Sequence, residues 1–417
     1  MARSVHIIGA GLAGLAAATR LANGSDTVVV HEATEHPGGR CRSYFDRAVG
    51  MTIDNGNHLV LSGNHAVLSF AQTIGSASHL VGPESAEFPF ADLVSGERWT
   101  LRISDGRMPW WIFDPARRVP GTRAFDYLRL ARLLLPSADR PIGDMMVCSG
   151  ALYQRLIGPL LLAALNIEPP VGSLALARAI LRETIAAGGS ACRPLIARDG
   201  LGPAFVEPAL KYLQAHGATV QLKHELRALR PAGGRMAELD FGDDTVTLGP
   251  DDAVILAVPP YAAAALIPGL TVPTTFRAIV NAHFRTDVPA NCPPMIGVVN
   301  GTVEWIFAFE GRLSVTISAG DRLLEIPRQE LAQCIWNEVS AVTGVTGELP
   351  PWQIVRERRA TFAATPEENA RRPGAVTSWS NLVLAGDWTA TGLPATLESA
   401  IRSGHRAAAL VGEMKAG

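Results

Sequence analysis

The sequence predicts an α/β protein that begins with a parallel sheet covered by helices, and three observations support this prediction. A β-branched run at residues 5–8 is followed by a helical pattern at residues 12–22 and a second β-branched run at residues 28–30. This order forms a βαβ unit, which requires parallel strands with helices packed on them. The turn between the first strand and the helix reads Gly9-Ala10-Gly11-Leu12-Ala13-Gly14.

The glycine turn is typical of Rossmann-type folds that bind dinucleotides. Gly9 permits the tight turn, Gly11 lets the backbone approach a pyrophosphate, and Gly14 allows close contact between helix and strand. The N-terminus of the helix offers unpaired N–H groups and a positive dipole end to phosphates. Glu32 follows the second strand, where a carboxylate accepts hydrogen bonds from a ribose diol. A glycine turn alone also serves packing, but strand, helix, strand and acid in register predict a dinucleotide site.

Length and composition limit the remaining architecture and the classes of function. At 417 residues the chain is too long for one simple core, so we expect a second domain. The net charge of −2 gives no reason to expect a nucleic-acid partner. The five scattered cysteines form no CxxC pair, so neither a disulfide framework nor a metal site is expected, and reduced thiols predict a cytoplasmic protein.

The sequence also limits how the protein could contact a membrane. No uninterrupted run of about 18 apolar residues is present, so we expect no membrane-spanning helix. The apolar N-terminal stretch has the outline of a signal peptide, but glycines interrupt it at the spacing of the dinucleotide turn. No basic amphipathic helix marks a docking surface. The expectation is a cytoplasmic protein that at most lies peripherally against the inner membrane.

The rest of the chain mixes helical and strand patterns. Residues 88–120 are rich in Trp, Pro and Gly and predict irregular or short-stranded structure. Residues 276–317 are strand-rich, and a final strand at residues 382–385 precedes a helix that starts near residue 394. Further helices are predicted at residues 125–135, 153–166, 173–187, 204–216 and 331–342.

Three further motifs favour FAD over NAD. Pro37-Gly38-Gly39-Arg40 follows the acidic residue, Leu384-Ala385-Gly386-Asp387 ends a C-terminal strand, and Gly392-Leu393-Pro394-Ala395-Thr396 precedes the last helix. Together they resemble the flavin-binding signature of the amine oxidase and phytoene desaturase superfamily, whose Rossmann-type domain is glutathione-reductase-like. The resemblance implies that the Gly-Gly-Arg loop lies by the phosphates and flavin, and that Asp387 contacts the ribityl–pyrophosphate portion. It also implies that the last helix points its N-terminus at the flavin, where its dipole favours negative charge.

The same resemblance implies a domain division and a set of residues that hold FAD non-covalently. The FAD-binding domain would comprise residues 1–85, 190–265 and 370–417, and a discontinuous α+β substrate-binding domain would comprise residues 86–189 and 266–369. Leu226 occupies the position where the family places main-chain atoms on adenine. The implied FAD contacts are Gly9, Gly11, Leu12, Ala13, Gly14, Glu32, Gly38, Gly39, Arg40, Gly56, Asn57, Leu226, Gly386, Asp387, Leu393, Thr396 and Leu397.

Several strings in the middle of the chain resemble one branch of this superfamily, the squalene-associated flavoproteins or hydroxysqualene dehydroxylases of bacterial hopanoid pathways. Three of these strings are Asp54-Asn55-Gly56-Asn57-His58, Pro109-Trp110-Trp111-Ile112-Phe113 and Asn281-Ala282-His283-Phe284-Arg285. The likeness extends from the first strand to the last helix. It implies that reduced FAD donates hydride to hydroxysqualene, a long apolar isoprenoid, with loss of water and formation of squalene for hopanoid biosynthesis.

The implied reaction sets requirements for the site. The alcohol is allylic, so protonation of its oxygen and loss of water leave a delocalised cation that hydride can quench. Such an enzyme needs a long apolar cavity, a proton donor and exclusion of water. His58 is the first candidate for the donor, because its segment approaches the flavin in related enzymes and imidazole titrates near neutral pH. Lesser candidates are Asp54, Glu304, Arg193 or a water held by the protein.

Other functions are compatible with the same motifs. A carotenoid- or phytoene-type desaturase would transfer hydride in the opposite direction, from substrate to flavin. A flavin amine oxidase is disfavoured because Trp388, beside Asp387, is the only aromatic residue at the flavin-binding end of the sequence. A non-catalytic flavin-binding protein would hold FAD that does not respond to an isoprenoid alcohol. The sequence does not indicate what reduces the flavin or how many subunits assemble.

Overall fold

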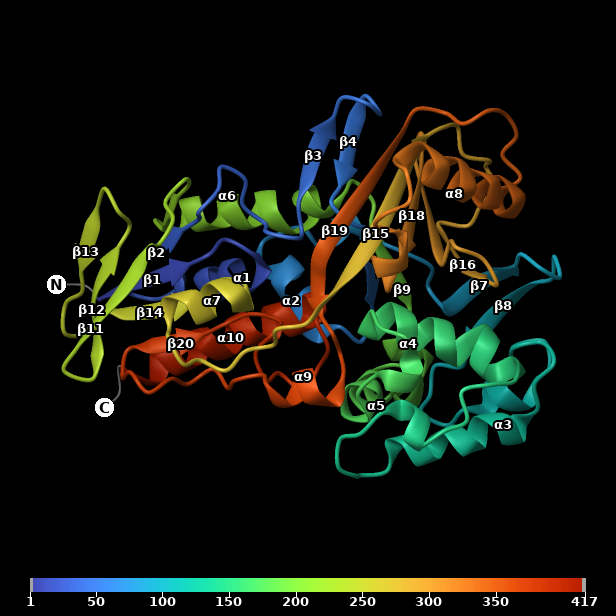
Figure 1. Cartoon of the computed structure of the whole chain (residues 1–417), viewed down its shortest axis with the longest axis horizontal. Coiled ribbons are helices and arrows are strands. Elements are labelled where there is room, and N and C mark those ends of the chain that lie inside the picture. The colour runs from blue at the N-terminus through green and yellow to red at the C-terminus, as the bar shows by residue number, and fades with distance from the viewer. Residues whose placement is uncertain (1–2, 415–417) are drawn as a thin grey trace.

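The computed structural model describes residues 3–414 and contains a five-stranded sheet with the strand order β10-β2-β1-β14-β20 (Figure 1). Every neighbouring pair in this sheet is parallel. Its strands are β1 (Ser4–Ile8), β2 (Thr27–His31), β10 (Thr219–Gln221), β14 (Ala253–Leu256) and β20 (Leu382–Leu384). The predicted Rossmann-type α/β fold is therefore confirmed.

The two faces of the parallel sheet are covered differently. In β14, Ala253 and Ile255 belong to the core that contains the helices α1 (Leu12–Leu21), α6 (Glu207–Ala215) and α10 (Leu397–Glu413). Val254 and Leu256 point to the opposite face and pack with the antiparallel sheet of β11 (Ala228–Ala232), β12 (Arg235–Asp240) and β13 (Thr245–Thr247), and with α7 (Pro260–Leu266). Because both faces are covered, β14 is buried along its whole length.

The two ends of the chain are joined by a close helix contact. Helix α10 crosses α1 at Gly404, where a Cβ atom would lie 2.1 Å from the carbonyl oxygen of Ala13. A side chain at this position would force the helices apart, so the glycine fixes their separation. The C-terminal helix is thereby packed directly against the helix that follows the glycine turn.

A second, seven-stranded sheet has the order β19-β15-β18-β17-β16-β7-β8 and is antiparallel except for the β16–β7 pair. Helix α8 (Arg328–Thr343) packs on it through Trp336, whose ring lies 5.2 Å from that of Phe284. Helices α3 (Ala124–Arg129), α4 (Gly158–Leu165) and α5 (Leu174–Glu183) lie beside this sheet, with α3 toward the edge of the molecule (Figure 1). The strands are β7 (Ala86–Asp92), β8 (Arg98–Ile103), β15 (Phe276–Arg285), β16 (Met295–Val299), β17 (Trp305–Phe309), β18 (Arg312–Ile317) and β19 (Trp352–Phe362).

The long strands β15 and β19 run between the two regions (Figure 1). All seven strands of this sheet fall within the segments expected for the substrate-binding domain, although the domain boundaries themselves stay a prediction. The remaining elements are β3 (Ser43–Asp46), β4 (Met51–Asp54), β5 (Leu59–Leu61), α2 (His65–Thr73), β6 (Leu80–Val81), β9 (Pro194–Ala197) and α9 (Pro366–Ala370). Within residues 3–414, no helix combines the length and hydrophobicity that crossing a bilayer would require.

Some element predictions need correction. The expectation for residues 88–120 holds, since they contain most of β7 and the whole of β8, two short paired strands, followed by irregular structure; other segments differ. The expected helix at residues 125–135 is α3 followed by a 3₁₀ turn at Leu130–Leu134. Strand β19 was not predicted because it forms an edge of the sheet and carries the charged run Arg356-Glu357-Arg358-Arg359, which obscures its strand pattern. The last helix begins at Leu397 because Thr396 caps it.

A buried histidine makes the stability of this fold depend on pH. His283 on β15 is fully buried, and its Nδ1 atom lies 2.8 Å from the Ser314 hydroxyl. Burial, reinforced by the positive charge of Arg312, lowers the pKa of His283 to about 3. An unfolded histidine titrates near pH 6.5, so the unfolded chain binds this proton first as the pH falls. His283 therefore contributes a loss of stability that begins near pH 6.5 and continues toward pH 3.

We expect His283→Gln to reduce this pH dependence. Between pH 7 and pH 4.5 the native protein should lose roughly 2 to 3 kcal/mol through His283 alone, whereas glutamine binds no proton. Glutamine can still hydrogen-bond with Ser314, which limits the loss of unfolding free energy that the substitution causes at pH 7. Urea unfolding of both proteins at the two pH values measures the difference. An identical pH dependence in the two proteins would contradict this assignment.

Candidate active site

One cavity of about 770 Å³ is lined by residues of both sheets and contains most of the predicted site residues. This volume lies in the upper part of the range for small-molecule sites, about 300–1,000 Å³. At one end the lining comes from the glycine turn after β1 and the loop after β2. At the other end it comes from β7, β8, β17, α4 and α5. The cavity thus has two chemically different ends, which we call the dinucleotide end and the apolar end.

At the dinucleotide end the three glycines have distinct structural roles. Gly9 has a φ of +105°, and a Cβ atom there would lie 2.6 Å from the carbonyl oxygen of Ala257 on the returning chain. A Cβ atom on Gly14 would lie 1.9 Å from the carbonyl oxygen of Gly9. Gly11 differs, because a Cβ atom there would meet nothing within 4 Å. Gly11 therefore borders open space, as a residue that leaves room for a phosphate should.

Glu32 stabilises the glycine turn from the end of β2. Its Oε2 atom accepts a hydrogen bond of 2.9 Å from the backbone N–H of Ala10. Its Oε1 atom accepts hydrogen bonds from the backbone N–H of Thr34 at 3.0 Å and from the Thr34 hydroxyl at 2.9 Å. Glu32 also lines the cavity, so the carboxylate predicted to bind a ribose is held in place by the turn itself.

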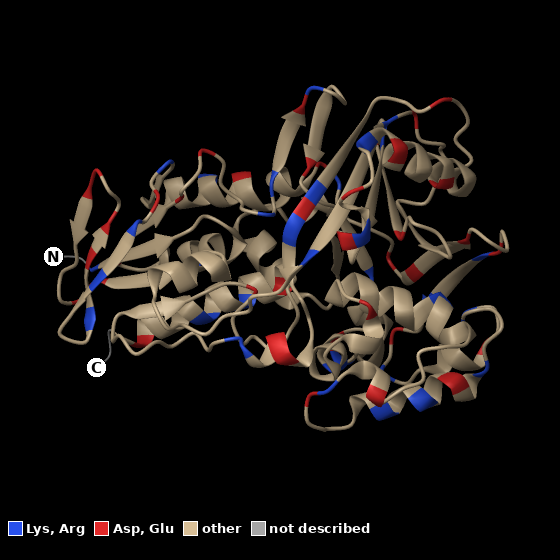
Figure 2. Ribbon diagram, in the orientation of Figure 1, with Lys and Arg blue, Asp and Glu red and all other residues tan. Residues whose placement is uncertain are grey.

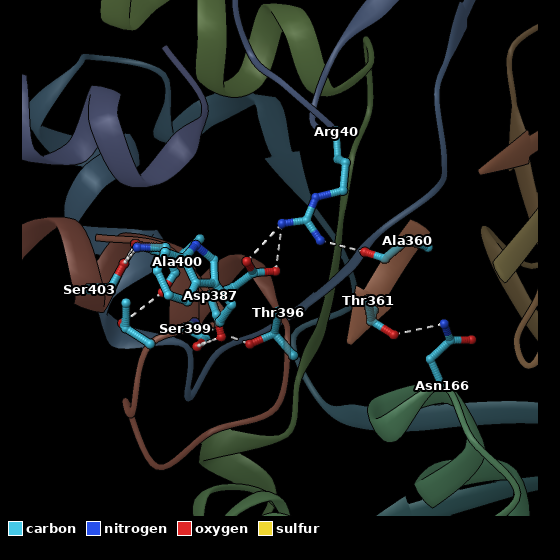
Figure 3. Close-up of polar contacts among 12 residues, drawn as sticks. Arg40, Asn166, Ala360, Thr361, Asp387, Thr396, Ser399, Ala400 and Ser403 are labelled. Carbon is cyan, nitrogen blue, oxygen red and sulfur yellow. Dashed lines mark hydrogen bonds and ion pairs between the residues drawn. The ribbon is translucent and has the colours of Figure 1, made fainter. Parts of the chain in front are cut away.

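An ion pair connects the Gly-Gly-Arg loop to the Gly-Asp motif at the far end of the chain (Figure 3). One guanidinium nitrogen of Arg40 donates to both carboxylate oxygens of Asp387, at 2.8 and 2.7 Å, and another donates to the carbonyl of Ala360. Although burial alone would lower it, the pKa of Arg40 is raised by the Asp387 carboxylate. Both charges line the cavity, so a cationic and an anionic group face any cofactor bound there.

The start of α10 faces the same part of the cavity. The Thr396 hydroxyl accepts a hydrogen bond of 3.1 Å from the backbone N–H of Ser399, and the Ser403 hydroxyl accepts one of 2.8 Å from that of Gly386 (Figure 3). Thr396 and Leu397 line the cavity, as does Leu393 in the preceding loop. The positive end of the helix dipole therefore lies at the cavity wall.

A polar strip crosses the cavity wall at the junction of its two ends. The Asn57 side-chain N–H₂ donates to the Thr316 hydroxyl at 3.2 Å, and this hydroxyl donates to Asn281 at 2.8 Å. Asn281 in turn donates to the backbone carbonyl of Asn55 at 3.3 Å. The Oδ1 atom of Asn57 is buried without a hydrogen-bond partner among residues 3–414.

His58 lines the cavity beside this strip, next to Arg40. Burial, reinforced by the positive charge of Arg40, lowers the pKa of His58 to about 4. The imidazole is therefore neutral at pH 7 in the protein without its cofactor, which corrects the expectation that it titrates near neutral pH. The main cause is burial, which disfavours the charged imidazole, and the nearby guanidinium adds to it by raising the free energy of a second positive charge.

The apolar end of the cavity is built mainly from aliphatic and aromatic side chains. Phe90 of β7 stacks on Trp99 with ring centroids 5.4 Å apart and contacts Trp305 of β17 at 5.7 Å. Further lining residues here are Phe88, Leu101, Ile103, Leu156, Leu160, Ala163, Ala164, Ile180, Ile185 and Phe307. This end could hold a long hydrocarbon chain away from water.

The structure gathers the predicted cofactor residues and separates the lesser catalytic candidates. Every predicted FAD contact lines the cavity except Gly14, which packs against the glycine turn. Asp54 is outside the cavity, where it accepts hydrogen bonds from Ser43 and Leu201, and Arg193 does not line it either. Glu304 does not line the cavity; its carboxylate accepts a hydrogen bond of 2.8 Å from the backbone N–H of Ser318, which does. Burial raises the pKa of Glu304 to about 7.

Sequence reasoning missed an aromatic pair in the cavity. Tyr261 and Phe276 contact each other edge to face at 6.2 Å, and both line the cavity, so Trp388 is not the only aromatic side chain there. Arg359 of β19 lies over both rings, at 4.7 and 5.9 Å from their centroids. A cation already occupies these ring faces, so the pair is poorly suited to hold an amine. These three residues are far apart in the sequence, which gave no signal of their contact.

The residues at the dinucleotide end fit FAD. The space at Gly11, the capped start of α10 and the unpartnered Asn57 Oδ1 provide positions for phosphate, flavin and a hydrogen-bond donor. Among residues 3–414, no three histidine, cysteine or acidic side chains form a group that could hold a metal ion.

Two alanine substitutions separate cofactor binding from folding. We expect Gly11→Ala to fold, because its φ of −72° suits alanine and the Cβ atom meets open space, yet to bind FAD about tenfold or more weakly. Gly14→Ala should instead lower the melting temperature, because its Cβ atom would clash with Gly9. FAD titration and thermal unfolding of both variants check this. Equal loss of FAD affinity and stability in both variants would contradict the separate roles.

Comparisons with known proteins agree with this geometry. The model of the flavin containing amine oxidoreductase family matches residues 12–412. Hydroxysqualene dehydroxylase of Sinorhizobium fredii is 61% identical over 98% of both chains, and that of Zymomonas mobilis is 46% identical over 97% of this chain and 98% of its own.

Solved structures share the fold at low sequence identity. Cyclohexylamine oxidase from Brevibacterium oxydans superposes with a TM-score of 0.71 at 15% identity, and a putative protoporphyrinogen oxidase from Exiguobacterium with 0.69 at 19% identity, each over the whole of both chains. These likenesses support the fold only. The family match and the near full-length relatives show that the chain belongs to the FAD-dependent oxidoreductases of the flavin containing amine oxidoreductase family, in the hydroxysqualene dehydroxylase branch.

Proposed function

We propose that the chain removes the hydroxyl group of hydroxysqualene reductively and releases squalene and water. The observation that carries this proposal is one cavity that joins a dinucleotide end to an apolar end. The name of the relatives that match nearly the whole chain supports the same substrate. A hydrocarbon with one hydroxyl group matches such a cavity. The hydroxyl can lie near the junction of the two ends, while the carbon chain occupies the apolar end.

The cofactor end is expected to hold FAD through groups already described. The backbone at Gly11 and the start of α1 would take the pyrophosphate, Glu32 the adenosine ribose, and Asp387 the ribityl chain. When bound, reduced FAD supplies a hydride. The N-terminus of α10 would stabilise negative charge on the adjacent flavin ring.

The substrate chemistry uses the apolar end. A proton is transferred to the hydroxyl oxygen, the carbon–oxygen bond breaks with both electrons on oxygen, and water leaves. The remaining allylic cation accepts a hydride, which forms the new carbon–hydrogen bond. Phe90, Trp305 and Phe307 line this end, and aromatic rings stabilise a cation that is removed from water. Exclusion of water by the aliphatic lining protects the cation from recapture.

His58 is the side chain that we propose to deliver the proton. It lines the cavity near the junction, and its low pKa of about 4 results from burial and from Arg40. The pyrophosphate of FAD is anionic, so its binding beside Arg40 would offset the guanidinium charge and raise the pKa of His58. A water held by the polar strip is the alternative donor.

We expect His58→Ala to retain FAD but to lose about 100-fold or more of its turnover on hydroxysqualene, the size of a typical general-acid contribution. His79→Ala is the matched control, because His79 pairs with Asp199 outside the cavity. The flavin absorption spectrum checks cofactor retention, and the initial rate of squalene formation checks catalysis. Near-normal turnover of His58→Ala would assign the proton transfer to a bound water.

Anaerobic incubation of the reduced enzyme with hydroxysqualene tests the function. The expected result is return of the oxidised flavin spectrum together with one equivalent of squalene. A desaturase would instead reduce the oxidised flavin when given a saturated isoprenoid segment. A flavin that stays reduced with hydroxysqualene, with no squalene formed, would refute the proposal.

We further propose that the protein works in the cytoplasm, peripherally against the inner membrane. All five cysteines are unpaired, which is expected in a reducing compartment. A substrate as insoluble as hydroxysqualene has to reach the cavity from a bilayer, so contact with a membrane would shorten its path.

A further inference from the structure

Residues 107–135 form an exposed surface that the reaction itself does not require. Large apolar side chains project from it into solvent, and several are more than half exposed: Met108 at 59%, Trp110 at 66%, Phe113 at 57%, Phe125 at 75% and Leu135 at 60%, with Leu128 at 47%. We call this set the outer surface. Several large exposed apolar side chains gathered in one segment mark an interaction site more often than single ones do.

A 3₁₀ turn and helix α3 build the outer surface, and each exposes apolar side chains to solvent. Trp110 and Phe113 are three residues apart on a 3₁₀ turn at Trp110–Phe113, so they lie on one side of it. Between them, Trp111 is buried and packs edge to face on Tyr127 of α3, with ring centroids 5.1 Å apart. The inner sides of the turn and of α3 are therefore in contact, and their outer sides are both left exposed.

Helix α3 continues the same arrangement. Phe125 and Leu128 are three residues apart and lie opposite the buried Tyr127, whose hydroxyl accepts a hydrogen bond of 2.9 Å from the backbone N–H of Val119. The 3₁₀ turn that follows buries Leu133. The 3₁₀ turn and α3 are thus each held by buried aromatic residues on one side and expose apolar residues to solvent on the other.

The charge of this segment is strongly positive. Residues 107–135 contain six arginines, two aspartates, no lysine and no glutamate, whereas the whole chain has a net charge of −2. Figure 2 shows basic residues along α3 at the edge of the molecule. The Asp126 carboxylate accepts a hydrogen bond of 2.8 Å from the backbone N–H of Arg123, and Asp114 accepts one of 2.9 Å from that of Ala116. Since six arginines outnumber two aspartates, the net charge of this segment is positive.

The outer surface is connected to the apolar end of the cavity. Arg178 and Arg182 of α5 donate to the backbone carbonyls of Leu133 and Leu134, at 3.0 and 2.6 Å. Ile180 of the same helix lines the cavity. Helix α5 thus contacts the segment of the outer surface on one side and the proposed substrate space on the other.

We propose that the outer surface docks on an anionic lipid bilayer. Aromatic side chains settle at the level of the headgroups, and arginines are attracted to anionic lipids. This combination distinguishes a membrane from an apolar protein partner, which offers no complement to six arginines. This proposal rests on the proposed function in one respect. Docking would serve to transfer the apolar substrate from the bilayer to the cavity. It also explains why the sequence shows no basic amphipathic helix, because the surface combines two short helices.

Co-sedimentation of the FAD-loaded protein with vesicles tests the proposal. Binding should be strong on vesicles that contain phosphatidylglycerol, weak on pure phosphatidylcholine, and reduced by added salt. Trp110→Ser combined with Phe113→Ser, and separately Arg129→Gln combined with Arg132→Gln, should each weaken binding about tenfold. The matched control is Phe45→Ser, since Phe45 is 66% exposed on the β3–β4 hairpin, away from α3 (Figure 1).

The outcomes separate this proposal from its alternatives. Retained flavin absorbance and normal turnover with detergent-dispersed substrate show that the variants are folded. Equal vesicle binding by the outer-surface variants and the native protein would overturn the proposal, as would an equal loss in Phe45→Ser. A dimer in gel filtration that the Trp110/Phe113 variant dissociates would assign the surface to a second copy of the chain instead. Vesicle binding by a protein that forms no squalene would refute only the proposed function.

Discussion

The site depends on the ion pair between Arg40 and Asp387, which are 347 residues apart. This pair joins the loop after β2 to the loop after β20 and leaves both charges at the cavity wall. Removing Arg40 would leave the Asp387 carboxylate, whose side chain is only 9% exposed, without its cationic partner, and an unpaired buried charge is costly. Burial lowers the pKa of His58, and the same guanidinium lowers it further, so the residue that joins the cofactor loops also influences the protonation of the proposed donor.

The division of the cavity follows from the two sheets that build it. Parallel strands end in loops with free N–H groups and acidic side chains, which suit phosphates and ribose. The seven-stranded sheet instead contributes rings and aliphatic chains from β7, β8 and β17. A hydroxyl group at the junction would meet the polar strip of Asn57, Thr316 and Asn281, while its hydrocarbon chain stays away from water. The outer surface places apolar and basic side chains, which suit a lipid bilayer, beside helix α5, and α5 lines the apolar end.

Local sequence was sufficient for the parallel sheet and for the positions of the FAD motifs, because each motif is a short run with its own backbone requirement. It was insufficient wherever function arises from residues on separate strands. Asn57, Thr316 and Asn281 form one strip only because three segments are folded together, and Arg359 covers Tyr261 and Phe276 for the same reason. The neutral state of His58 also escaped prediction, since it depends on burial and on Arg40. Edge strand β19 was hidden by its exposed charges.

The central claim is that one cavity holds the flavin at the glycine turn and the isoprenoid chain between β7, β17 and α4. A crystal structure of the protein with FAD and squalene tests it most directly. The account predicts FAD phosphates at Gly11, the flavin between Asp387 and the polar strip, and squalene in contact with Phe90, Leu156 and Trp305. Squalene bound outside this cavity, or a flavin whose ring does not face the apolar end, would contradict the account.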